Sequence, residues 1–390
     1  MLDINDLQTR AEQGDAAAQS SLGSCYGEGK DVPEDPERAV YWWTKAADQG
    51  DVKAQFHLAL WYEHGIFGVP KDLEKAVYWW TKLAEKGDDR GQYFLGSCYD
   101  EGEGVPKNRK KAVYWWAKAA EQGHALAQKS LGICYDRGKG VPKNPEKAVY
   151  WWAKAAKQGN FHAQCYFGSC YDEGKGVPKN RKKAVYWWTK AAKQGDDWNL
   201  YDIGLSYYNG SGVPKDPEKA VYWWTKAAEH GYAIAQNSLG ICYDKGKGVP
   251  KDPEKAAYWW TKAAEQGNAH AQFNLGYYYS DGEDVPIDPE KVLYWFTKAA
   301  KQAYTNAQFR LAGRHELGIF GVPKDLEKAV YWYTKLAEQG DARGQYFLGS
   351  CYDQGEGVPK DPEKAVYWWT KAAEQGNTEA EEKIKNLKRE

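Results

Sequence analysis

The chain has 390 residues, and its 53 Lys and Arg nearly balance its 54 Asp and Glu, giving a formal net charge of −1. This balance argues against a broad surface for a polyanion, so we expect no binding of nucleic acid. No stretch approaches the run of about 18 apolar residues that a membrane span needs, so we also expect no membrane span.

The first residues, MLDINDLQTRAEQGD, have neither a basic start nor an apolar run, and therefore show no secretory signal. We expect a cytoplasmic protein, or a periplasmic or secreted one if a leader was removed. Residues 9–13 are similar to the end of the second helix of each repeat described below. Residues 1–14 are therefore predicted to form an N-terminal half-repeat cap.

Val-Pro pairs recur along the rest of the chain at steps of 36 residues, apart from two steps of 37. Such a period predicts tandem repeats in place of two or three globular domains. A charged helix at 377–390, with Ile384 and Leu387 on one side, is predicted to cap the last repeat. The ten predicted repeats are 15–50, 51–87, 88–123, 124–159, 160–195, 196–231, 232–267, 268–303, 304–340 and 341–376.

Each repeat contains two amphipathic helical patterns, shown here for residues 232–267. The first pattern runs from Ala233 to about Lys245 and ends at two glycines. Its Gly240 is expected to let the second helix approach closely. The second pattern opens at Asp252-Pro253-Glu254, where Asp suits the N-cap and Pro the first helical position. Its predicted buried stripe consists of Ala256, Trp259, Trp260, Ala263 and Ala264.

The 20 Trp residues of the chain indicate how the repeats pack. A single repeat cannot bury both sides of its Trp pair, whereas stacked neighbours can. A buried Trp removes roughly 150–250 Å² from water, on the order of 4–6 kcal/mol before opposing terms. We therefore predict an all-α, α/α solenoid with a core distributed along its length.

Six of the seven Cys occupy one repeat position, and the seventh, Cys165, lies five residues before Cys170. Equivalent positions in neighbouring repeats are about 10 Å apart, which is too far for a disulfide. This column also cannot share one zinc ion. Reduced, buried thiols are the expected state.

The repeat motif resembles the Sel-one-like repeat (SLR), a relative of the tetratricopeptide repeat (TPR). The resemblance covers essentially residues 9–380. It implies a right-handed superhelix of antiparallel helix pairs, with the first helices on the concave face, and adaptor or scaffold roles in protein complexes. The seventh repeat carries the motif at Ala233, Ala235, Gln236, Leu239, Gly240, Tyr243, Gly246, Gly248, Val249, Asp252, Lys255, Ala256, Trp259, Lys262, Ala263, Ala264 and Gly267.

Some bacterial members of that family look like immunity or anchoring partners of secreted or envelope proteins. One subgroup ties its helices with paired Cys, and this sequence lacks that pairing.

Positions two residues before and two after the core Leu of each first helix are expected to face the concave side. They are unusually apolar, and exposed aromatic residues often anchor protein partners. Burial between adjacent first helices is the alternative. With the aromatic departures in repeats 6–9, the candidate partner-binding residues are Phe56, Tyr93, Trp198, Tyr201, Tyr208, Phe273, Tyr277, Phe309 and Tyr346.

Repeats 6–9 depart most from the motif, and repeat 9 has Arg314 and His315 where Cys and Tyr usually stand. An aromatic groove and simple drift with compensating packing both explain these departures. Repeats 2 and 9 each carry one extra residue, which places Phe67 and Phe320 in the turn. These rings either cover the turn or protrude as contact points.

A column of acids lies five residues after the core Leu, at the C-terminal end of each first helix, where the helix dipole disfavours an acid. Pairing with lysines such as Lys139, Lys175, Lys247 or Lys143 is one interpretation. An acidic stripe that attracts a basic partner segment is the other. The column consists of Glu63, Asp100, Asp136, Asp172, Asp244, Glu316 and Asp353.

No phosphate-binding loop, Cys-x-x-Cys or His-Glu-x-x-His motif is found, and the Gly-x-Gly-Val-Pro turn has no strand before it. We therefore expect no catalytic residues, cofactor or metal. The leading hypothesis is a non-enzymatic adaptor that binds a protein or peptide. The alternatives are an immunity protein that neutralises a secreted toxin or effector, and a carbohydrate-binding or hydrolytic module.

Overall fold

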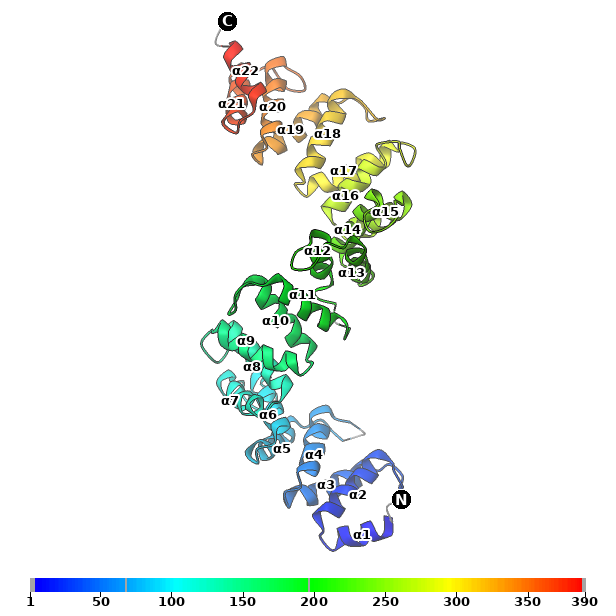
Figure 1. Ribbon diagram of the computed structural model, residues 1–390, viewed down its shortest axis with the longest axis vertical. Coiled ribbons are helices and arrows are strands. Elements are labelled where there is room, and N and C mark those ends of the chain that lie inside the picture. Colours follow the sequence, from blue (N-terminus) through cyan, green and yellow to red (C-terminus); the bar gives the residue numbers. More distant parts are fainter. Residues whose placement is uncertain (1–3, 67–68, 196, 388–390) are drawn as a thin grey trace. The chain divides into compact units, whose positions relative to one another are not determined.

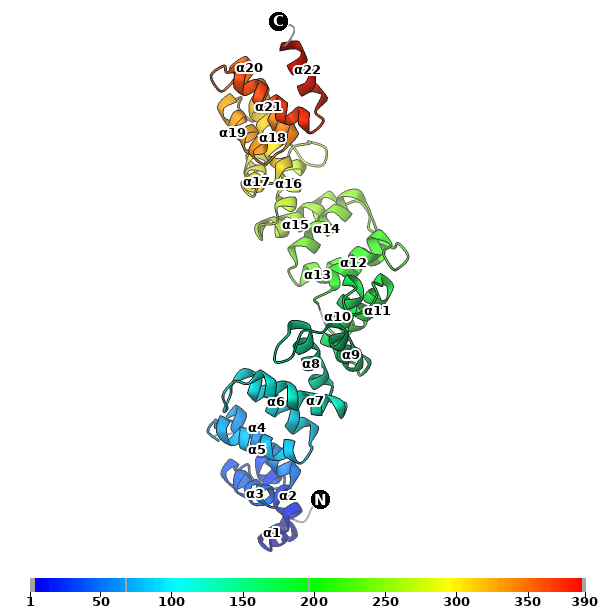
Figure 2. The same cartoon turned by 90° about the vertical axis from the view of Figure 1, so that its left-hand side faces the viewer.

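The structure is a computed structural model that describes residues 4–66, 69–195 and 197–387, with the side chain of Leu387 outside the described part. All regular elements in these ranges are helices, 22 in number (Figures 1 and 2). The chain divides into two compact units, Met1–Asn199 and Leu200–Glu390. Within each unit every helix packs on the next one along the chain. The predicted all-α solenoid of helix pairs is thereby confirmed.

The first unit contains α1(Ile4–Glu12), α2(Ala16–Glu28), α3(Pro36–Asp48), α4(Val52–His64), α5(Leu73–Glu85), α6(Asp89–Glu101), α7(Arg109–Glu121), α8(Ala125–Arg137), α9(Pro145–Lys157), α10(Phe161–Glu173) and α11(Arg181–Ala192). The second unit contains α12(Leu200–Asn209), α13(Pro217–Glu229), α14(Ala233–Lys245), α15(Pro253–Glu265), α16(Ala269–Tyr278), α17(Pro289–Lys301), α18(Thr305–Leu317), α19(Leu326–Glu338), α20(Ala342–Gln354), α21(Pro362–Glu374) and α22(Thr378–Leu387). Even-numbered helices from α2 to α20 are the first helices of the repeats, and the odd-numbered ones that follow are the second helices.

Local capping explains where these helices begin and end. Asp252 precedes α15 and its carboxylate accepts a hydrogen bond from the Lys255 N–H, as Asp or Asn does at the start of every second helix. Gly246 ends α14 in the left-handed region at φ 62°, a conformation that side chains with a Cβ rarely adopt. The predicted ends of both helices in this repeat are confirmed.

The glycine after the core Leu leaves space for the ring of the second Trp of the same repeat. A Cβ on Gly96 would lie 2.6 Å from Cδ1 of Trp116, so only glycine leaves room for the ring. The same overlap would occur between Gly240 and Trp260, as the sequence predicts. Trp259, which precedes Trp260, is only half-buried, so the buried stripe of this helix is narrower than the sequence predicts.

Buried glutamines connect successive repeats, a feature that the sequence analysis did not single out. The side-chain amide of Gln128 donates to the carbonyl of Ala120 on the preceding second helix, at 3.0 Å. Its oxygen accepts from Gln158 on the second helix of its own repeat, at 2.8 Å. Each such glutamine therefore joins three helices while satisfying its own buried polar atoms.

The two ends of the chain carry additional helices. Leu7 and Ala11 of α1 are buried. Ile384 of α22 packs half-buried on the cluster around Trp369 and Ala380. Leu387, the other predicted apolar residue of this cap, has its side chain outside the described residues.

Candidate protein-binding surface

The two predicted aromatic residues of the near-duplicate repeats 2 and 9 pack on the core with one face. Phe56 on α4 lies edge-on to Trp80, with ring centroids 5.3 Å apart, and the guanidinium of Arg90 lies 4.5 Å from its centroid. Phe309 on α18 lies 6.5 Å from Tyr333, which stands at the position of Trp80, and the guanidinium of Arg343 lies 4.8 Å from its centroid. Both rings are half-buried. Part of each predicted contact surface is therefore already used in packing.

Four further predicted residues are half-buried in a similar way. Tyr93 stacks on a histidine of the next repeat at 4.7 Å, and Tyr201 stacks on Trp224 at 6.0 Å. Phe273 lies 5.4 Å from Phe296. Tyr346 lies 5.2 Å from its neighbour Phe347. The remaining exposed part of each ring is what a partner could contact, and this role stays a prediction.

The three remaining aromatic candidates have different surroundings. Trp198 is 63% exposed and belongs to the first unit. Tyr208 is half-buried against Trp224 at 5.2 Å, and its hydroxyl accepts a hydrogen bond from Lys247 at 3.3 Å. Tyr277 is 49% exposed on α16. Only Tyr277 stands beside a substantial cavity.

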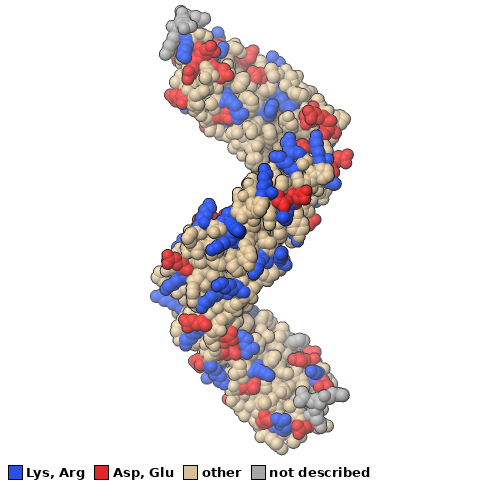
Figure 3. All heavy atoms as spheres, in the orientation of Figure 1, with Lys and Arg blue, Asp and Glu red and all other residues tan. Residues whose placement is uncertain are grey.

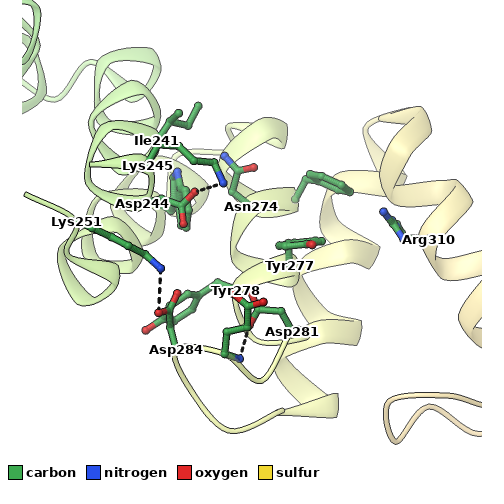
Figure 4. A pocket seen from close by; sticks show the side chains of 13 residues that line it. Ile241, Asp244, Lys245, Lys251, Asn274, Tyr277, Tyr278, Asp281, Asp284 and Arg310 are labelled. Carbon is green, nitrogen blue, oxygen red and sulfur yellow. Dashed lines mark hydrogen bonds and ion pairs between the residues drawn. The ribbon is translucent and has the colours of Figure 1, made fainter. Parts of the chain in front are cut away.

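That cavity has a volume of about 520 Å³ and lies among α14, α16 and α18 of the second unit. Figure 4 shows Ile241 on α14, Tyr277 on α16 and Arg310 on α18 at its edge. Phe273 contributes a further apolar wall. Ile241 and Tyr277 are also exposed, and eight of the 13 residues that line the cavity are charged or Asn, so its surface is of mixed polarity.

Charged groups at this cavity neutralise each other. Lys251 pairs with Asp284 across two repeats at 3.5 Å, and Lys245 pairs with Asp244 at 2.9 Å (Figure 4). These exposed ion pairs are weak and can exchange for a partner's charges at small cost. The arrangement offers an apolar centre with a polar rim, the usual composition of a protein-binding surface.

Most acids of the predicted stripe have compensating cations. Asp136 pairs with Lys175 of the next repeat, as one interpretation of the sequence expects. Asp100 and Asp172 instead pair with Arg109 and Arg181 at the start of the following helix, and Asp244 with its neighbour Lys245. Asp353 lies half-buried at the end of α20. Attraction of a basic partner by this column stays a prediction.

The two Glu residues of the column have a different role from the Asp residues. Glu63 accepts a hydrogen bond from Nε1 of Trp80 at 3.0 Å, and Glu316 accepts one from the Tyr333 hydroxyl at 2.6 Å. Burial raises the pKa of the Glu63 carboxyl, although the Trp80 N–H opposes that rise. These two acids are therefore bound into the packing of repeats 2 and 9.

A second exposed aromatic row was missed in the sequence analysis. It consists of the Tyr before each Trp pair, and every member is between 50% and 53% exposed. Each ring stands edge-on to the following Trp, and a lysine four residues later lies over it in most repeats, as in Tyr150, Trp151 and Lys154. The recurring Tyr-Trp-Trp triplet was the available signal.

The surface carries charges of both signs. In Figure 3, Lys and Arg are interspersed with Asp and Glu on the face shown. Among the residues described, no group of three His, Cys, Asp or Glu side chains could hold a metal ion. No helix in that part of the chain is long and apolar enough to cross a membrane. All seven Cys are buried and none is in a disulfide, and burial raises the pKa of Cys98 and Cys351 to about 12.

Helix pairs that repeat about every 36 residues and share one distributed core define an α/α repeat solenoid. The family profile for the Sel1 repeat matches ten consecutive segments, and the chain belongs to this family as the sequence motif predicts. The matched segments are 16–51, 52–88, 89–124, 125–160, 162–196, 200–232, 233–268, 269–304, 305–341 and 342–377.

Two solved structures are similar to this chain at appreciable identity. A protective antigen of uropathogenic Escherichia coli strains, which has an SLR fold, is 37% identical, with a TM-score of 0.86 over 97% of this chain and 81% of that one. A Sel1 repeat protein from Oxalobacter formigenes is 35% identical, with a TM-score of 0.65 over 79% of this chain and 89% of that one. A search of curated proteins gave no match.

An immunity protein from Pseudomonas aeruginosa shares 22% identity, with a TM-score of 0.32 over 60% of this chain and 88% of that one. This likeness reflects the shared helical fold and carries no functional argument.

Proposed function

We propose that the protein is a non-enzymatic scaffold that binds a partner protein or peptide through the first helices of its second unit. Membership of the Sel1-repeat family supports this proposal, because these repeats generally mediate protein–protein interaction. The seven buried thiols, none of them in a disulfide, support the cytoplasm as its compartment.

The observation that carries the proposal is the exposed pair Ile241 and Tyr277 beside the cavity of about 520 Å³. An exposed aromatic ring next to a concave apolar surface is a typical anchor for a partner side chain. The weak ion pairs at its rim give the polar border that such contacts need.

The test is site-specific photo-crosslinking with p-benzoylphenylalanine in place of Tyr277. The matched control places it at Tyr258, which is similarly exposed at 53% but lies on a second helix. We expect position 277 to crosslink a defined protein that position 258 does not. The purified partner should then bind the wild type at least about tenfold more tightly than an Ile241→Ala/Tyr277→Ala variant.

Equal crosslinking at both positions would place the contact elsewhere. Unchanged affinity of the double variant, at unchanged helicity, would exclude Ile241 and Tyr277 as anchors.

A further inference from the structure

A second cavity, in repeat 9, holds a buried arginine without a counter-ion. It has a volume of about 380 Å³ and is lined by residues that include Phe309, Gly313, Arg314, Leu317 and Phe320. Arg314 is only 7% exposed. We call this space the Arg314 cavity.

The guanidinium of Arg314 lies between two aromatic rings. Its central carbon is 4.5 Å from the ring centroid of Phe320 and 5.4 Å from that of Phe296. Nε and Nη1 are buried and reach no hydrogen-bond acceptor among the residues that the structure describes. A buried cation without an acceptor is costly, and aromatic faces offset only part of that cost.

Neighbouring charges do not compensate Arg314. Arg310, one turn earlier on α18, opposes its charge and together with burial lowers the pKa of Arg314 to about 10. Glu316, the acid that also lines the cavity, accepts its hydrogen bond from the Tyr333 hydroxyl. The cavity therefore has two cations, Arg310 and Arg314, against one acid, and that acid is already bonded to Tyr333.

Repeat 2 shows how the cavity arises, because Leu60 and Trp61 stand there in place of Gly313 and Arg314. Trp61 is buried and packs edge-on against Trp43 at 4.7 Å, the position that Arg314 takes against Phe296. At Gly313 an added Cβ would meet no atom within 4 Å. In repeat 9, Gly313 therefore leaves space open at the position of Leu60, and Arg314 places a guanidinium where repeat 2 has the Trp61 ring.

The outer wall of the cavity is apolar and solvent-facing. Leu317 is 63% exposed and Phe320 is 43% exposed. Phe320 also has a backbone φ of 56°, in the left-handed region that is unfavourable for an aromatic residue. Phe296, on the other side of the guanidinium, is fully buried, so Phe320 is the ring whose movement would expose Arg314.

We propose that the Arg314 cavity binds a partner segment in which a carboxylate lies next to an apolar side chain. The carboxylate would supply the acceptor that Arg314 lacks, and guanidinium–carboxylate hydrogen bonds are among the strongest in proteins. The apolar side chain would contact Leu317 and Phe320. This inference rests on the proposed protein-binding function; the Arg314 cavity shares Arg310 with the cavity beside Ile241 and Tyr277, but its own anchors are Arg314, Leu317 and Phe320.

The first experiment tests the chemistry with two small probes, 4-phenylbutyrate and its uncharged isostere 4-phenylbutanamide, titrated calorimetrically into the full chain. We expect the acid to bind the wild type at least about tenfold more tightly than the amide. Arg314→Met should abolish this preference, and Gly313→Leu should weaken both probes by filling the cavity. Leu60→Gly, which opens repeat 2 without supplying a guanidinium, should create no preference for the acid.

The melting temperature of free Arg314→Met separates binding from folding. We expect it to equal or exceed that of the wild type, because an unpaired buried charge is removed. Equal binding of acid and amide to the wild type, or a preference that survives in Arg314→Met, would overturn the proposal. A marked loss of stability in this variant would also overturn it, since Arg314 would then be a structural residue.

The second experiment identifies the source of the carboxylate by panning a phage-displayed random dodecapeptide library on the full chain. We expect enriched peptides with Asp or Glu beside Leu or Phe, and their loss on Arg314→Met. Enriched peptides that bind Arg314→Met equally well would overturn the Arg314 assignment while leaving the proposed function intact. No enrichment despite binding of 4-phenylbutyrate would overturn the protein segment as ligand and weaken the proposed function as well.

Discussion

Repeats 2 and 9 are near-duplicates, and comparing them separates packing from candidate function. Both have an extra turn residue, an Ala in place of the glycine that follows the core Leu, and a Glu in place of Asp in the acidic column. They differ at ten positions, of which Leu60 and Trp61 against Gly313 and Arg314 bear most directly on the cavity. The shared features stabilise a different position for the large ring of the second helix, which is Trp80 in repeat 2 and Tyr333 in repeat 9. The differences open a cationic cavity.

The shared features have one physical cause. In five of the repeats with glycine, the second Trp donates its N–H to a backbone carbonyl of the first helix, as Trp116 does to Tyr93 at 3.1 Å. In repeat 2, the side chain of Ala59 is incompatible with this position of the Trp ring, and Trp80 donates its N–H to the Glu63 carboxylate instead. Glu is one methylene longer than Asp. The Ala and the Glu are therefore coupled.

The largest effect is expected from exchanging the residues in which the two repeats differ. Trp61→Arg should lower the free energy of unfolding by about 3–5 kcal/mol, because it removes a buried ring and introduces an unpaired charge beside Trp43. Arg314→Trp should be neutral or stabilising, since repeat 2 accommodates Trp there. Urea unfolding followed by circular dichroism measures both. Similar losses in the two variants would show that the repeats are not equivalent in packing.

A smaller effect tests the coupling of Ala and Glu in a glycine-type repeat. Gly96→Ala should cost about 1–3 kcal/mol, because its Cβ overlaps Trp116. Adding Asp100→Glu should recover part of this loss by offering the displaced ring an acceptor. A double-mutant cycle is the measurement. Additive losses would mean that the pair Ala59 and Glu63 is coincidental.

The pH dependence of repeat 2 provides a third test. The raised pKa of Glu63 means that the folded state holds its proton more tightly than the unfolded state, whose ordinary value is 4.5. The wild-type free energy of unfolding should therefore fall as the pH rises from about this value through the raised folded pKa. Glu63→Gln should lack this contribution, so the difference in urea midpoint between variant and wild type should grow in favour of the variant between pH 4 and 7. A constant difference would contradict the assigned burial.

The smallest effect is a change in labelling rate without a change in stability. It tests whether a reagent reaches the repeat position that is Trp61 in repeat 2, Arg314 in repeat 9 and Cys in six other repeats. Burial raises the pKa of Cys351 to about 12, so native thiols should react with iodoacetamide at pH 8 at least about 100-fold more slowly than unfolded ones. Arg314→Cys should add one thiol that reacts faster than the native seven, because it lines the cavity. Native Cys351, at the same position of the next repeat, is the internal control and should stay slow. Mass spectrometry of the labelled peptides distinguishes these outcomes.

Much of the fold could be predicted from sequence because its signals are local. Asp252-Pro253 and Gly246 determine helix ends through backbone geometry and capping, independently of distant contacts. The close approach of another helix at Gly240 followed from the absence of a side chain there, whereas the structure identifies Trp260 as the contact. The family resemblance extended this reasoning to the whole chain.

The candidate binding residues were harder to predict because their exposure depends on neighbouring repeats. Phe56 has the spacing of a surface residue, yet Trp80 and Arg90 cover much of it. Arg314 was recognised as a departure from the motif, but its burial depends on Phe296 from the preceding repeat and on the conformation of the Phe320 turn. Side-chain packing between repeats is not encoded in the periodicity of a single repeat.

The glutamines between repeats also determine how cooperatively the protein unfolds. In a repeat array, the free energy of unfolding is the sum of the stabilities of single repeats and of the interfaces between neighbours. A hydrogen bond across each junction therefore couples the folding of one repeat to that of the next. Repeat 2 keeps this bond, because the Gln55 amide donates to the Ala47 carbonyl at 2.9 Å, whereas in repeat 6 Leu200 replaces the glutamine. Partial unfolding should begin at the junction that lacks the glutamine, dividing the array into two segments that lose structure in separate steps.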